Sequence, residues 1–152
     1  MKLAEALILR ADCQKRIEQL RERLTRSAKV QEGDTPPENP QTLLTELDNA
    51  INELTNLIKR INKTNSTTSV EPGLTISDAL AQRDTILLKR GVYNSLINAG
   101  VVYQDRYSSS EIKTFSTVNI AELQTQMDDL ARQGRELDTK IQELNWLTEL
   151  LD

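Results

Sequence analysis

Apolar side chains recur every three or four residues along most of this chain, which is the spacing of one face of an α-helix. The longest such run alternates steps of three and four over more than four heptads. A stripe with this period favours a long helix that supercoils against a partner. The positions of this stripe are Ile120, Leu123, Met127, Leu130, Gly134, Leu137, Ile141, Leu144, Thr148 and Leu151.

Three further stretches have the same helical spacing, so the sequence predicts an all-α fold. We expect helices at about residues 3–29, 40–61, 76–98 and 120–150. Asn39 and Pro40 suit the N-cap and the first position of the second helix. Asn119 and Glu122 have the spacing of a capping box at the start of the fourth. The polar run 62–69 favours turns and predicts the end of the second helix.

The segment 101–118 breaks the helical pattern. Its ends have β character, so we expect either an irregular excursion or a short β-hairpin between the third and fourth helices. The whole of 1–152 is then predicted to form a single domain. Its architecture is a long-helix antiparallel four-helix bundle or an elongated pair of helical hairpins.

The second helix carries three apolar residues per heptad, which makes a stripe wider than a two-stranded coiled-coil seam. Such a helix needs two neighbours, so we expect a homo-oligomer that forms through helical faces. Trp146 lies off the main stripe of the fourth helix and is expected to be buried against another element.

Residues 1–30 carry a net charge of +4 and residues 119–152 a net charge of −5. These charges predict that the first and last helices are neighbours.

The composition excludes several classes of site. The chain has no His and one Cys, which removes His-based metal sites, His-assisted nucleophiles and an intrachain disulfide. We expect no metal site, no cofactor and no catalytic residues. A pI of about 5.0 with 3% aromatic residues argues against a nucleic-acid partner. No apolar stretch approaches the ~18 residues of a membrane span, so we expect a cytoplasmic protein without a membrane partner.

The connections between helices hold the densest sets of hydrogen-bond donors. Guanidinium and amide groups there offer preformed contacts for a polar or anionic ligand. An equally weighted interpretation is that they only tie the loops to the helices. The candidate ligand-binding residues are Arg60, Asn62, Asn65, Arg83, Asp84, Arg106, Tyr107 and Ser108.

Several segments of the chain together have a recognisable pattern. They are residues 1–7, 28–33, 60–65, 79–84, 106–108, 110–113, 116–118 and 137–146. With these segments the chain resembles a septicolysin-like family of small uncharacterised bacterial proteins. The resemblance implies a membrane-active cytolysin, and it brings no catalytic residues to carry over.

The leading functional hypothesis from these observations is a non-enzymatic, cytoplasmic, self-assembling helical protein. One alternative is a small-ligand or nucleotide-binding enzyme with its site at the connections between helices. The other is the cytolysin that the family resemblance implies. Oligomeric state, ligand binding and membrane leakage are the properties that distinguish these three hypotheses.

Overall fold

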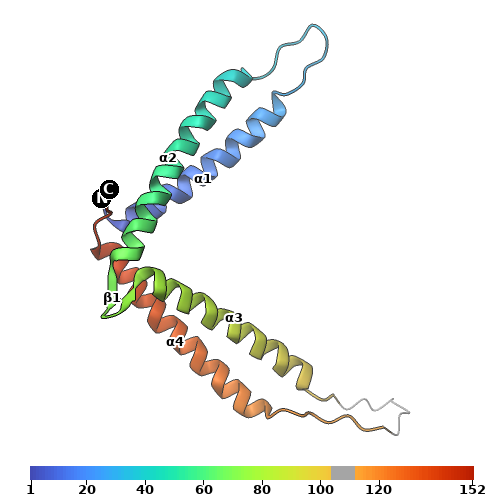
Figure 1. The fold of residues 1–152 in the computed structure, drawn as a ribbon. Coiled ribbons are helices and arrows are strands. Elements are labelled where there is room, and N and C mark those ends of the chain that lie inside the picture. The colour runs from blue at the N-terminus through green and yellow to red at the C-terminus, as the bar shows by residue number, and fades with distance from the viewer. Residues whose placement is uncertain (104–111) are drawn as a thin grey trace. The chain divides into compact units, whose positions relative to one another are not determined.

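The computed structural model in Figure 1 describes residues 1–103 and 112–152. The described residues form four helices and one two-stranded antiparallel sheet, which confirms the predicted all-α class. In chain order the elements are α1 (Leu3–Arg26), α2 (Pro40–Thr67), β1 (Ser69–Glu71), β2 (Leu74–Thr75), α3 (Ile76–Gly100) and α4 (Ile120–Leu147).

The helices are packed in pairs, α1 beside α2 and α3 beside α4 (Figure 1). The chain divides into two compact units. The first comprises residues 1–77 and 142–152, and the second comprises residues 78–141.

The α1–α2 pair has an aliphatic core flanked by ion pairs. Leu20, Leu43 and Ala50 are buried at its centre. Arg23 donates to Glu38 at 2.9 Å, and this hydrogen bond lowers the pKa of the Glu38 carboxyl. Arg16 pairs with Glu53 of α2 at 3.0 Å, and Arg23 also pairs with Glu46. Arg16 and Arg23 of α1 are therefore paired with carboxylates that lie within α2 or, for Glu38, just before it.

The N-terminal end of α1 and the residues that precede it contact the residues that follow α4. The backbone N–H of Leu3 donates to the Thr148 carbonyl, and that of Leu150 donates to the Met1 carbonyl. The ammonium group of Lys2 pairs with Glu149 at 2.6 Å. Because the backbone after residue 147 makes these pairings, α4 stops three residues before the predicted end at 150. At its own C-terminus α1 ends at Arg26 instead of 29, where the Ser27 N–H closes the last turn.

The second helix is six residues longer than predicted, because the polar run after Ile61 supports it. The Thr64 hydroxyl donates to the carbonyl of Arg60 at 2.8 Å, and the Thr67 hydroxyl donates to that of Lys63 at 2.9 Å. Thr64 is fully buried, and its oxygen also accepts a hydrogen bond from the Leu151 N–H at 3.0 Å. A side chain that was expected to compete with the helix is instead held inside it by a tertiary partner.

A short β-hairpin, β1 and β2, lies between α2 and α3, where the sequence analysis predicted no strand. Ser69 pairs with Thr75 and Glu71 with Leu74. Gly73 has a φ of +81°, which glycine adopts without strain. Residues 101–103 and 112–118 form no strand, since no other strand is adjacent to pair with them among the described residues; residues 104–111 lie outside that part of the chain.

Substitution of Thr64 tests the contribution of its buried hydroxyl. We expect Thr64→Val to lower the free energy of unfolding by about 1–3 kcal/mol, because the Leu151 N–H loses its acceptor. The matched control is Thr45→Val in the same helix. The exposed Thr45 hydroxyl donates only to the carbonyl of Gln41, so the control should change stability by no more than about 0.5 kcal/mol. Equal losses in urea denaturation of the two variants would contradict this role.

Candidate functional site

The residues predicted to bind a ligand fall into three groups. Arg60, Asn62 and Asn65 lie on α2 in the first unit. The second group is Arg83 and Asp84 on α3 in the second unit, where their side chains approach to 3.4 Å. The third, Arg106, Tyr107 and Ser108, lies outside the described residues.

Arg60 holds the last residues of the chain against α2. Its Nε donates to the Leu151 carbonyl at 3.0 Å, and its Nη2 pairs with the Asp152 carboxylate at 2.8 Å. Lys63 donates to the Asp152 carbonyl at 2.7 Å. The side chains of Asn62 and Asn65 form no hydrogen bond within the described part of the chain. Arg60 alone of this group therefore fits the interpretation in which the residues tie segments together, since its Nε and Nη2 bind the last two residues of the chain.

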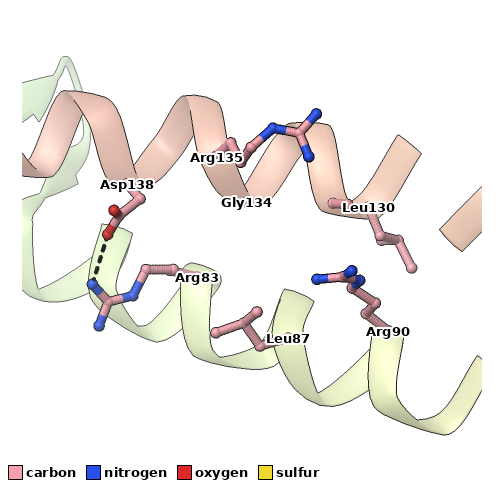
Figure 2. Close-up of a pocket in the computed structure, with 8 residues that line it drawn as sticks. Arg83, Leu87, Arg90, Leu130, Gly134, Arg135 and Asp138 are labelled. Carbon is pink, nitrogen blue, oxygen red and sulfur yellow. Dashed lines mark hydrogen bonds and ion pairs between the residues drawn. The ribbon is translucent and has the colours of Figure 1, made fainter. Parts of the chain in front are cut away.

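Arg83 marks one edge of a hollow between α3 and α4. Its Nη1 reaches across to the carboxylate of Asp138 on α4 at 3.0 Å, as the dashed line in Figure 2 shows. The hollow has a volume of about 430 Å³. Its remaining lining residues are Leu87 and Arg90 from α3, and Leu130, Ala131, Gly134 and Arg135 from α4.

The charge in this hollow is unbalanced. Three arginines line it but only one carboxylate, Asp138, and that group is already paired with Arg83. Among the described residues, Arg90 and Arg135 form no ion pair. The hollow is thus positively charged on a chain whose net charge is −4. Arg90 and Arg135 were not among the predicted site residues, although the seven-residue spacing from Arg83 to Arg90 places both on one helix face.

A second hollow, of about 270 Å³, lies beside Trp146 in the first unit. Ala4, Leu7 and Ile8 of α1 are among its lining residues. Trp146 itself is 57% exposed, so the burial predicted for it is not provided by the described residues. Asn145 next to it is buried.

Cys13 is a structural residue of the α1–α2 core. It is completely buried, its thiol donates to the Ala50 carbonyl at 3.8 Å, and its sulfur accepts from Arg16 at 3.3 Å. Burial raises the pKa of the Cys13 thiol, which disfavours the nucleophilic thiolate. Within residues 1–103 and 112–152, no group of three His, Cys, Asp or Glu side chains is arranged to hold a metal ion.

The comparison with family models gives a match over residues 10–150 to a family of unknown function, DUF6847. The chain belongs to this family. It is also similar to a solved structure, described as the crystal structure of a functionally unknown conserved protein from Corynebacterium diphtheriae. The two are 46% identical, with a TM-score of 0.92 over 99% of each chain. No curated protein matches.

These matches correct the resemblance to septicolysin-like proteins. The family over residues 10–150 is DUF6847, and the similar solved structure carries no cytolysin description. None of the described helices is both long enough and apolar enough to cross a membrane. The assignment of this chain to the septicolysin-like family was therefore wrong. The hypothesis of a membrane-active cytolysin, which rested on that assignment, loses its support.

The environment of Cys13 predicts its reactivity. We expect the native thiol to react with 5,5′-dithiobis(2-nitrobenzoic acid) at least about tenfold more slowly than the thiol of the urea-unfolded chain, because burial blocks both access and ionisation. The absorbance of the released thiolate measures both rates. Equal rates in the two states would show that Cys13 is accessible in the folded protein.

Proposed function

We propose that this protein is a helical assembly protein that self-associates through a second apolar row on α2. The observation that carries the proposal is the row Leu44, Ile51 and Ile58. These residues are spaced by seven positions and remain 40%, 41% and 37% exposed. Large aliphatic side chains at heptad spacing are typical of a helix–helix contact.

The geometry of α2 explains why one neighbour does not cover this row. Leu43, Ala50 and Leu57 are buried, and each precedes a member of the exposed row by one residue. Successive residues of an α-helix are about 100° apart. The side of α2 that carries Leu43, Ala50 and Leu57 is therefore packed, while the exposed row points well away from it. At ~1.5 Å per residue the row extends for about 21 Å.

A second copy of the chain is the partner that fits this face best. The positions three and four residues from Ile51 are Leu47, Asp48, Leu54 and Thr55, so a single charge adjoins the centre of the row. A face with so little charge does not repel its own copy, which a twofold interface requires. Asn62 and Asn65 lie at its C-terminal end, where paired amides can fix the register of two helices.

An assembly role of this kind requires no catalytic group. That the protein is not an enzyme, and that it acts in the cytoplasm, both stay predictions of the sequence analysis. The alternative of a ligand-binding enzyme with its site at the connections gains no support from Arg60, whose Nε and Nη2 bind the last two residues of the chain.

A charge placed in the row should separate the copies. We expect light scattering of the unaltered protein at micromolar concentration to give a multiple of the 17.2 kDa chain mass. Ile51→Glu should shift the protein to that single-chain mass, because a buried, unpaired carboxylate is costly in an apolar interface.

The matched control is Asn52→Glu, which adds the same charge at the next residue, outside the row. This variant should keep the mass of the unaltered protein. A single-chain mass for the unaltered protein, or the same mass for the Ile51→Glu variant as for the unaltered oligomer, would overturn the proposal.

A further inference from the structure

We propose that the hollow between α3 and α4 binds a small organic anion, with a carboxylate or phosphate head group at Arg90 and Arg135 and a short apolar body. This site belongs to the second unit and is separate from the assembly face on α2. Its support comes from the charge of the hollow, from its lining and from one glycine.

Arg90 and Arg135 carry guanidinium groups that form no ion pair within residues 1–103 and 112–152. No acidic residue lies three or four positions from Arg90, where Ile86, Leu87, Tyr93 and Asn94 stand. Without an intrahelical partner, its charge is available to a ligand. In Figure 2 the Arg90 side chain extends from α3 toward α4.

Arg135, which lines the hollow from α4, likewise lacks a free carboxylate partner on its own helix. The one carboxylate three or four residues away from it is that of Asp138, and Arg83 holds this group at 3.0 Å from the opposite helix. Arg83 and Asp138 thus join the helices at one edge of the hollow. Arginine is suited to carboxylates and phosphates because its planar donors can bind two oxygens at once.

The lining between these charges is apolar. Leu130 is buried and Leu87 is half exposed at the opposite wall. The volume of about 430 Å³ falls in the range of ~300–1,000 Å³ that small-molecule sites usually have. An aliphatic or aromatic group of a few carbons would cover Leu87 while its head group meets the arginines.

Gly134 supplies an argument that is independent of charge. A glycine inside a helix costs about 1 kcal/mol relative to alanine. A Cβ added at Gly134 would lie 3.6 Å from Ile86 Cγ2, which is an ordinary van der Waals contact. At Gly100, by contrast, a Cβ would lie 2.9 Å from Val118 Cγ2, so packing itself excludes a side chain there. Packing does not require the glycine at 134, and its effect is to leave the hollow open.

The binding test uses hexyl phosphate and hexanoate as probes, compared with inorganic phosphate and 1-hexanol by titration calorimetry. We expect each amphiphilic anion to bind at least about tenfold more tightly than inorganic phosphate, because only it fills the apolar lining. 1-Hexanol should bind at least about tenfold more weakly than either anion, since it lacks the charge. No binding of either anion into the millimolar range, or equal affinity for inorganic phosphate, would overturn the proposal.

Two variants locate the site. Arg90→Gln combined with Arg135→Gln should weaken hexyl phosphate binding by about tenfold or more, since both charge-assisted contacts are lost. The control is Arg132→Gln, which removes an α4 arginine that pairs with Asp129 and Glu136 and does not line the hollow. This control should bind as the unaltered protein does. Equal affinity of the double variant and the control would place the ligand elsewhere.

Gly134→Ala separates ligand binding from folding. The added methyl should raise the melting temperature, because alanine favours the helix, and should weaken hexyl phosphate binding by occupying the hollow. Unchanged affinity in this variant contradicts the proposed site. The Ile51→Glu variant should bind as the unaltered protein does, so that loss of assembly and loss of anion binding can be told apart.

Discussion

The structure depends on one constraint: a single neighbouring helix can bury only part of the apolar surface of α2. In the first unit α2 has a single helical neighbour along its length, and that neighbour covers the row that contains Leu43 and Ala50. The next row, Leu44, Ile51 and Ile58, repeats at the same seven-residue spacing and is also apolar, but it stays partly exposed. The free energy gained by burying apolar side chains is roughly proportional to the apolar area removed from water. The uncovered row is therefore the surface through which we propose that two copies of the chain associate.

Polar contacts at the chain ends complement this sparse apolar packing. The buried hydroxyl of Thr64 receives the backbone of Leu151, while Arg60 and Lys63 bind the last residues from the same side of α2. Residues 1–3 pair with residues 148–150 by backbone hydrogen bonds. Segments far apart in the sequence are thus fixed by a few directional contacts. Of the residues that were expected to bind a ligand, Arg60 is the one that makes these contacts.

The sequence predicts the local parts of this fold well, and it fails where a tertiary partner decides. The side chain of Asn39 accepts from the Gln41 N–H, and that of Asn119 accepts from the Glu122 N–H, as their spacing predicted. The helical state of residues 62–67 was missed because it depends on a partner 87 positions away from Thr64.

The arginine hollow shows the same limit. Arg83 was selected for its place near the core boundary, and its partner Asp138 was not, because that contact joins residues 55 positions apart. Arg90 and Arg135 were not among the predicted site residues. Only the pairing of α3 with α4 places both at the same hollow.

The most direct test of assembly through α2 is the distance between spin labels on two copies. Thr55 lies about 40° around the helix from Ile51, and Thr45 lies about 120° from it. Single cysteines at these exposed positions can carry a nitroxide label while the buried Cys13 stays unlabelled. The account predicts a dipolar coupling between copies labelled at position 55, at a shorter distance than for copies labelled at position 45. Absence of coupling at both positions, or a shorter distance at position 45, would contradict it.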